Sequence, residues 1–218
     1  MAVAFEDARE RMVAEQLEAR GIEDERVLDA MRVVPRHLFV EPALQERAYD
    51  DTPLPIGERQ TISQPYMVAL MSATLAPRPG ERVLEVGGGS GYQAAILAEL
   101  GARVMSLERL PALGERARRV LCALGYLDRV TIEIADGSLG WAAGAPWSAI
   151  VVAAAAPGIP RPLVQQLAPD GRLVLPVGEE ELQTLVRICR GATGLVEEYF
   201  GECRFVKLRG SHGWEEES

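Results

Sequence analysis

A glycine-rich segment that follows a short apolar run is the part of the chain best suited to hold a ligand through its backbone. Residues 83–86 are mostly apolar, three glycines then follow with the spacing Gly87-x-Gly89-x-Gly91, and a helical pattern begins at Tyr92. Glycine lets the backbone turn tightly and lets a ligand approach to contact distance. The loop closes one residue earlier than the dinucleotide motif G-x-G-x-x-G, a form more typical of S-adenosylmethionine sites. The spacing taken alone also fits a tight turn without a ligand.

Acidic residues stand where two predicted strands end. Glu108 follows the apolar run 103–107, close to the interval of about 20 residues at which a carboxylate reaches a ribose diol. A carboxylate can accept hydrogen bonds from both hydroxyls, but Glu108 also suits the start of the helix expected from Pro111, where negative charge is favourable. Asp136-Gly137 closes the run 130–134, at the sheet edge where α/β proteins bind ligands. The same dipeptide also forms simple turns.

A second polar segment, Thr61-Ile62-Ser63-Gln64-Pro65, precedes a helical pattern of apolar residues. A serine before a helix, with proline just inside it, is usually an N-cap, so the pattern by itself favours capping over chemistry for Ser63. Small side chains at 153–156 follow the apolar strand 149–152. They either leave room for a ligand or permit close helix packing.

The surrounding pattern predicts an α/β fold: a mostly parallel sheet that ends in an antiparallel C-terminal hairpin, with an N-terminal helical extension. We expect one domain over 1–218, in which 1–78 carries the N-terminal helices and the substrate loop and 79–218 forms the cofactor-binding core. A helix over 5–20 ends at Gly21, a second begins at an Asp24 N-cap and ends at Pro35, and residues 35–55 form an extended wrap. Further elements are predicted as strands at 83–86, 103–107, 130–134, 149–152, 172–177, 183–189 and 203–208 and helices at 67–75, 111–124 and 163–167.

The composition is that of a globular protein with a full core, with 48% hydrophobic and 25% charged residues. A formal net charge of −9 argues against broad binding to a phosphate backbone. The three cysteines include no C-x-x-C pair, so we expect neither disulfides nor a metal site, and a reducing cytoplasm fits. The charged N-terminus predicts no signal peptide, and the longest apolar run, 149–156, is far shorter than the ~20 residues that span a bilayer, so no membrane is expected.

With these motifs in place, the sequence resembles the protein-L-isoaspartate (D-aspartate) O-methyltransferase family over nearly its whole length. The most discriminating segment is Gln60 to Pro65, because other methyltransferases share the glycine loop but lack it. The other matching segments are Met12-Val13, Gln16-Leu17, Arg20-Gly21-Ile22, Val34-Pro35-Arg36, Phe39-Val40, Leu54-Pro55-Ile56-Gly57, the glycine loop with Tyr92-Gln93-Ala94-Ala95, Ala154-Ala155-Ala156-Pro157, Gly171-Arg172-Leu173-Val174 and Arg204-Phe205-Val206.

The resemblance implies a Rossmann-like class I methyltransferase that moves a methyl group from S-adenosylmethionine to the α-carboxylate of L-isoaspartyl residues, leaving S-adenosylhomocysteine. The ester then re-forms a succinimide, part of which opens to normal aspartate. A carboxylate is already ionised at neutral pH, so no general base is needed and rate comes mainly from positioning.

The resemblance also implies roles for individual residues. Ser63 would orient the substrate carboxylate while also capping its helix. The methionine end of the cofactor would be held by Glu85 and the loop, the ribose by Glu108, and the adenine would lie beside Asp136 and Gly137. The loop residues are Gly87, Gly88, Gly89, Ser90 and Gly91, and the expected substrate-binding residues are Thr61, Ile62, Gln64, Ala154, Ala155 and Pro157.

The sequence departs from the family pattern at four positions, which lie in three places. Glu58-Arg59 replaces a pair that often includes glycine, which predicts a stiffer loop before Ser63, and we hypothesise that Arg59 approaches the substrate carboxylate. Gly88 stands where threonine is common, and Ser148 where aspartate is common. We further expect the N-terminal helices and the 35–55 wrap to close over the cofactor.

Alternative functions and partners follow from the same residues. A nucleic-acid methyltransferase would carry an Asn/Asp-Pro-Pro-Tyr/Phe motif after the fourth strand, where this chain reads Ala153-Ala154-Ala155-Ala156-Pro157. A nicotinamide oxidoreductase fits the short glycine loop poorly. A non-catalytic relative and a methyltransferase dedicated to one peptide remain open at this point. We expect isoaspartyl proteins and peptides as partners, no nucleic acid, and a monomer in the cytoplasm.

Overall fold

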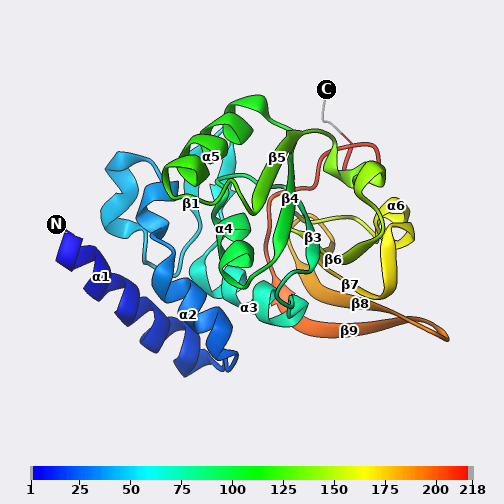
Figure 1. Ribbon diagram of the computed structural model, residues 1–218, viewed down its shortest axis with the longest axis horizontal. Helices are drawn as coiled ribbons and strands as arrows, with labels where there is room; N and C mark the ends of the chain where they lie inside the picture. The colour runs from blue at the N-terminus through cyan, green and yellow to red at the C-terminus, as the bar shows by residue number, and fades with distance from the viewer. Residues whose placement is uncertain (1, 216–218) are drawn as a thin grey trace.

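The computed structural model describes residues 2–215, and one seven-stranded sheet runs through its centre (Figure 1). The strands lie in the order β5-β4-β3-β6-β7-β8-β9. The first five are mutually parallel, whereas β8 and β9 run antiparallel to their neighbours. The strand bounds are β3 Arg82–Val86, β4 Arg103–Glu108, β5 Val130–Ile134, β6 Trp147–Val152, β7 Leu167–Gly178, β8 Gln183–Gly191 and β9 Gly194–Cys203. The predicted fold class, a mostly parallel sheet with an antiparallel C-terminal hairpin, is confirmed.

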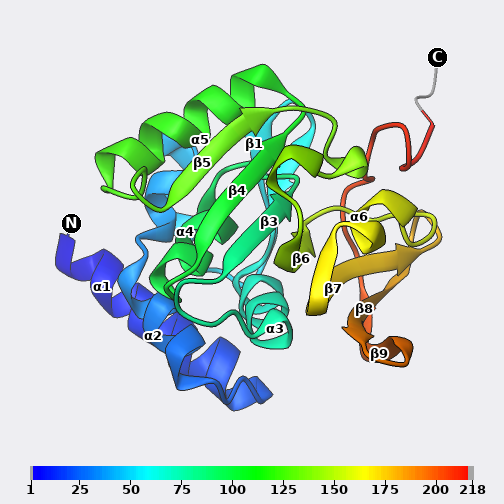
Figure 2. The ribbon, with the colours of Figure 1, turned by 45° about the vertical axis from the view of Figure 1, so that its right-hand side comes forward.

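Helices precede the sheet and alternate with its parallel strands. Their bounds are α1 Ala2–Arg11, α2 Glu25–Val33, α3 Pro65–Leu75, α4 Tyr92–Glu99, α5 Pro111–Ala123 and α6 Arg161–Gln165, with a π-helix at Met12–Leu17 and 3-10 helices at Glu18–Arg20, Arg36–Phe39, Pro42–Arg47, Gly137–Leu139 and Ala142–Gly144. The N-terminal helices lie at one end of the molecule and β7 to β9 at the other (Figures 1 and 2). Among residues 2–215, none of these helices is long and apolar enough to span a bilayer.

The helix boundaries follow the local signals in the sequence. Gly21, with φ of +89°, stops the first helical segment, as predicted. The Asp24 carboxylate accepts a hydrogen bond from the Arg26 N–H at 3.0 Å, which is the expected N-cap of α2.

Alternating side chains along the strands divide the core between the two faces of the sheet. On β3, Val83 packs into a cluster with the N-terminal helices, α3, α4 and α5. Its neighbour Leu84 packs on the other face with Trp147 and the residues of α6. Both faces are therefore covered, as a parallel sheet requires. The larger cluster joins residues before and after position 79, so the two predicted parts of the chain share one core.

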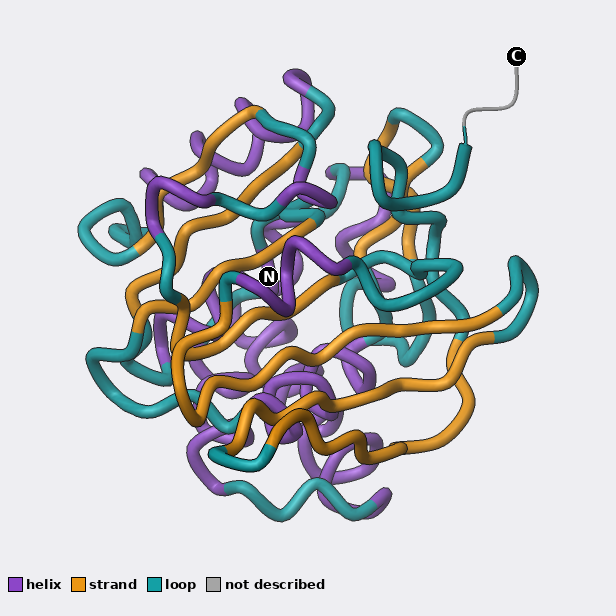
Figure 3. Tube along the Cα trace, turned by 90° about the vertical axis from the view of Figure 1, so that its right-hand side faces the viewer, coloured by secondary structure: helices purple, strands orange, loops and turns teal. Residues whose placement is uncertain are grey.

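The structure corrects two sequence-based expectations and adds a hairpin that the sequence did not predict. Residues 35–55 are not an extended wrap, because they form the two 3-10 helices Arg36–Phe39 and Pro42–Arg47. An unpredicted hairpin follows, with β1 Leu54–Gly57 antiparallel to β2 Gln60–Ile62. The strand expected at 203–208 is absent: β8 pairs instead with Gly194–Cys203, across a turn in which Gly191 faces Gly194. Figure 3, in which the right-hand side of Figure 1 faces the viewer, shows the strands of this end of the sheet in orange.

Candidate functional site

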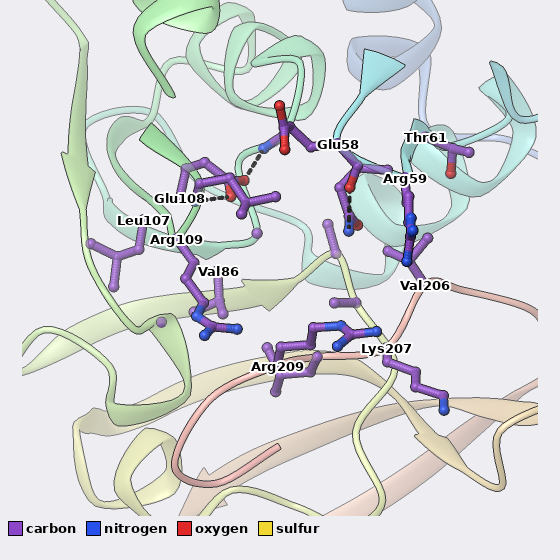
Figure 4. Close-up of a pocket in the computed structure, with 18 residues that line it drawn as sticks. Glu58, Arg59, Thr61, Val86, Leu107, Glu108, Arg109, Val206, Lys207 and Arg209 are labelled. Carbon is purple, nitrogen blue, oxygen red and sulfur yellow. Dashed lines mark hydrogen bonds between the residues drawn. The ribbon is translucent and has the colours of Figure 1, made fainter. Parts of the chain in front are cut away.

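A pocket of about 660 Å³ opens at the carboxyl ends of the parallel strands, where the strand order changes direction between β3 and β6. This volume lies in the range of small-molecule sites. The pocket is lined by Glu58, Arg59, Gln60, Thr61, Val86, Gly87, Gly89, Leu107, Glu108, Arg109, Leu110, Gly137, Ala153, Ala154, Val206, Lys207, Leu208 and Arg209. Figure 4 shows the labelled members of this set converging from the β1–β2 turn, the ends of β3 and β4, and the segment after β9.

The glycine loop forms the floor of the pocket. The N–H groups of Gly87 and Gly88 donate to the Leu107 carbonyl at 2.9 and 3.1 Å, which ties the loop to the end of β4. Gly91 has φ of +86° and little room for a side chain, since a Cβ there would lie 3.1 Å from the Ala117 Cβ. The glycines thus permit the turn and the close packing of α4 on α5. Gly88, Ser90 and Gly91 support the loop but do not line the pocket, whereas Gly87 and Gly89 do.

Glu108 lies across the loop and fixes its geometry. Its two carboxylate oxygens accept hydrogen bonds from the Gly89 N–H at 2.7 Å and from the Leu110 N–H at 2.8 Å. The side chain is 7% exposed and faces the pocket. Each oxygen keeps a second lone pair, so Glu108 can hold the loop and still accept from a ligand diol. Its two suggested roles, opening α5 and binding a ribose, are therefore compatible.

Glu85 is buried beneath the loop and does not line the pocket. Burial raises the pKa of Glu85 to about 8, although the Ser106 hydroxyl donates a hydrogen bond to Oε2 and opposes that rise. Oε1 is buried without a hydrogen-bond partner. Ser106 also explains the missing threonine, because a Cβ on Gly88 would lie 2.3 Å from the Ser106 Oγ. That hydroxyl fills the space beside the loop.

Asp136 anchors the C-terminal segment, while its neighbour Gly137 lines the pocket. The Asp136 carboxylate accepts from the Ser138 N–H and hydroxyl at 2.9 and 2.6 Å and from the Ser211 N–H and hydroxyl at 2.8 and 3.1 Å. Burial acts to raise the pKa of Asp136, but these hydrogen bonds outweigh it and hold the pKa below its usual value. The side chain is therefore engaged within the protein, and its closeness to an adenine ring stays a prediction.

The polar segment before α3 does not place Ser63 at the N-cap position that the sequence suggested. Gln64, not Ser63, is the N-cap residue of α3, and no side chain caps that helix end. The expected capping role of Ser63 is therefore wrong. Ser63 is half-buried, and its hydroxyl makes no hydrogen bond within residues 2–215. Thr61 lines the pocket, Ile62 is buried, and Gln64 donates to Asp51 at 3.4 Å.

Beside Thr61, the β1–β2 turn brings Glu58 and Arg59 into the pocket wall. Both residues have positive φ, +51° and +56°, a conformation that favours glycine or asparagine. Strain of this kind gathers at functional sites. The stiff loop predicted from the Glu58-Arg59 pair is thus a tight turn.

The alanine run forms part of the opposite wall. Ala153 and Ala154 line the pocket, but Ala155 does not, because its backbone pairs with the segment after β9. Pro157 lies at a separate shallow hollow beside Trp214. Sequence reasoning missed the whole C-terminal wall, Val206 to Arg209, and also the lining residues Gln60, Val86, Leu107, Arg109, Leu110 and Ala153. The match to the family at Arg204-Phe205-Val206 was a signal that this segment contributes to the site. The expectation of a strand at 203–208 obscured that signal.

Comparisons with known proteins agree on one family. The family model described as "Protein-L-isoaspartate(D-aspartate) O-methyltransferase" matches residues 8–213. "Protein-L-isoaspartate O-methyltransferase 2" of Geotalea uraniireducens is 58% identical over 95% of both chains. "Protein-L-isoaspartate O-methyltransferase 1" of Syntrophobacter fumaroxidans is 54% identical over 98% of this chain and 99% of its own. A Plasmodium falciparum protein assigned to the same family, solved with S-adenosyl-L-homocysteine, has a TM-score of 0.79 and 28% identity over 92% of this chain and 98% of its own.

Proposed function

Because this chain belongs to the protein-L-isoaspartate(D-aspartate) O-methyltransferase family, we propose that the pocket at the ends of β3, β4 and β6 is its active site, with Ser63 orienting the substrate. The activity is methyl transfer from S-adenosylmethionine to the α-carboxylate of L-isoaspartyl residues in damaged proteins and peptides. The pocket is the observation that carries this assignment to its lining residues, and Ser63 is proposed from its place two residues after the lining residue Thr61.

The residues present fit the cofactor. Glu108 keeps acceptor capacity at the pocket surface, Gly87 and Gly89 offer a floor without side chains, and Gly137 packs tightly on Val86, where a Cβ would lie 2.6 Å from Cγ1. S-adenosylmethionine supplies a methyl group activated by the sulfonium. We assign the ribose to Glu108, the methionine end to the loop, Ser90 and the underlying Glu85, and the adenine to the Asp136-Gly137 corner.

Ser63 is proposed as the group that aims the substrate carboxylate. Ser63 does not itself line the pocket, but it lies one residue beyond β2 and two residues after Thr61, which does. If the alternation of the exposed Thr61 and the buried Ile62 continues, Ser63 lies on the same side of the chain as Thr61. A hydroxyl without a partner among residues 2–215 can donate to one carboxylate oxygen and leave the other to attack the methyl carbon. No proton has to be removed, so the contribution is orientation. Thr61, Ile62, Gln64, Ala154, Ala155 and Pro157 are the proposed surroundings of the substrate segment.

Arg59 offers a positive charge on the same wall. It is exposed, lies directly before Gln60 and Thr61, and reaches into the pocket in Figure 4. We assign it to attract the α-carboxylate toward Ser63. An Arg59→Ala variant is expected to raise KM for an isoaspartyl peptide, and an unchanged KM would contradict that assignment.

The test of Ser63 compares Ser63→Ala with Ser148→Ala, which removes a hydroxyl from β6 outside the pocket lining. We expect Ser63→Ala to lower kcat about 10-fold or more, in the range of one lost positioning hydrogen bond, with S-adenosylhomocysteine affinity unchanged. Ser148→Ala should match the parent chain in both. Equal kcat in all three proteins would assign Ser63 to structure alone.

Finer features of the protein are also proposed. We infer a monomer that acts in the cytoplasm without nucleic acid; the acidic composition supports the absence of nucleic acid, and three free cysteines support a reducing compartment. We likewise propose one domain over 1–218, with the substrate loop in 1–78 and the cofactor core in 79–218. Size-exclusion chromatography with light scattering tests the oligomeric state, and a mass near twice 23.7 kDa would contradict it.

A further inference from the structure

Positive charge is concentrated in the pocket of an otherwise acidic chain. Four of the 23 lysines and arginines line the pocket, whereas only two of the 32 aspartates and glutamates do. One of those two, Glu108, is already hydrogen-bonded to two backbone N–H groups. A local excess of cations within a negatively charged surface focuses anions on the pocket.

The cations on the C-terminal wall are held by a fixed backbone. The Ala155 N–H donates to the Val206 carbonyl at 2.8 Å, and the Leu208 N–H donates to the Ala155 carbonyl at 2.7 Å. Beyond Leu208 the segment is held by Asp136, which accepts from Ser211. Lys207 and Arg209 therefore lie on a segment that is tied to the loops following β6 and β5.

These two side chains differ in what they contact. The Lys207 ammonium lies 2.8 Å from the Glu180 carboxylate and 5.7 Å from the Trp214 ring, so its charge is partly compensated. Arg209 is exposed, and its guanidinium extends across the pocket from the segment after β9, while Arg59 enters from the β1–β2 turn (Figure 4). Cations therefore face the pocket from two walls, the β1–β2 turn and the segment after β9.

The α-carboxylate to be methylated is one anion, and the proposed function assigns it to the Arg59 and Ser63 wall. We propose that Arg209 receives a second carboxylate of the substrate, so that the enzyme favours isoaspartyl segments with acidic residues close to the damaged site. This inference rests on the proposed function and adds a substrate class to it. Arg209 is a specificity residue here, since it would contact the flanking sequence and not the reacting atoms.

The experiment uses three isoaspartyl peptides that differ only in the two residues on each side of the damaged site, which are all Glu, all Gln or all Lys. For the parent chain we expect KM to rise from Glu to Gln to Lys, by about three-fold between Glu and Gln, the range of one partly exposed ion pair. Salt near 0.5 M should compress the differences, because exposed charges are screened.

Arg209→Gln should abolish the preference for Glu over Gln, and Arg209→Lys should retain it. Arg119→Gln, which removes the same charge from an exposed position on α5, should behave as the parent chain. S-adenosylhomocysteine binding by each variant shows that it is folded. Equal KM values for the three peptides, or a preference that survives Arg209→Gln, would overturn the inference while methylation of the neutral peptide still supports the proposed function. Methylation of none of the three would contradict the proposed function and this inference with it.

Discussion

Replacing Glu108 with glutamine exchanges one carboxylate oxygen for an NH₂ group. The substitution tests separately the support that Glu108 gives to the glycine loop and its proposed contact with the ribose. In the parent chain both carboxylate oxygens accept backbone hydrogen bonds, at 2.7 Å from Gly89 and 2.8 Å from Leu110. The glutamine carbonyl can accept only one of them, and its NH₂ group must face the other N–H. A buried donor left without an acceptor costs about 2 kcal/mol, which corresponds to a fall in Tm of about 6 °C for a chain of this size.

The same substitution removes the negative acceptor proposed for the ribose. Hydrogen bonds to charged groups contribute about 1.5–3 kcal/mol, so we expect the Kd for S-adenosylhomocysteine to rise about 10- to 100-fold, measured by isothermal titration calorimetry below the Tm of the variant. Glu115→Gln, an exposed charge change on α5, is the control and should leave Tm and Kd unchanged. A lowered Tm with an unchanged Kd would refute the cofactor role and leave Glu108 as a support for the loop alone.

Three further changes test the electrostatics and the strained turn. Burial raises the pKa of Glu85 to about 8 from an ordinary 4.5, so between these pH values the folded chain keeps a proton that the unfolded chain releases, and the free energy of unfolding falls as pH rises. The Tm of Glu85→Gln should therefore exceed the parent Tm by a margin that grows from pH 5 to pH 8. A margin that stays constant over this range would contradict the prediction. Burial acts to raise the pKa of Glu81, but the hydrogen bond from Arg172 opposes burial and helps to hold that pKa below its usual value. Arg172→Met should therefore lower the Tm at pH 7, and the loss of Tm should shrink as pH falls below 4.5 toward the lowered pKa. An equal loss of Tm at all pH values would contradict this role of Glu81. Glu58→Gly should raise the free energy of unfolding in urea by about 1 kcal/mol, because it relieves a positive φ, and a loss of stability would show that the turn is unstrained.

The sequence was most informative where one residue type satisfies one local requirement. Gly21 and Asp24 mark helix ends because left-handed backbone and N-capping are local properties, and both predictions are confirmed. The parallel strands were recognisable because both of their faces are buried, which makes the sequence nearly continuous in apolar residues.

The features that could not be predicted from the sequence depend on tertiary contacts or lack a typical local pattern. β9 is an edge strand with exposed Leu195 and Tyr199, so burial imposes no alternating pattern on its sequence. The β1–β2 turn uses Glu58 and Arg59 at positive φ, where pattern reasoning looks for Asn-Gly. The pocket wall at Val206 to Arg209 depends on the pairing of Lys207 with Ala155, about 50 residues earlier in the chain, which no local signal encodes.

The most direct test of the account is transfer of labelled methyl from S-adenosylmethionine to two synthetic peptides that are identical except for L-isoaspartate or aspartate at one position. We expect base-labile label on the isoaspartyl peptide alone, because only in L-isoaspartate does the backbone continue through the β-carbonyl and leave the α-carboxylate free. Equal labelling of both peptides, or label that resists base, would contradict methylation of an isoaspartyl carboxylate as the reaction.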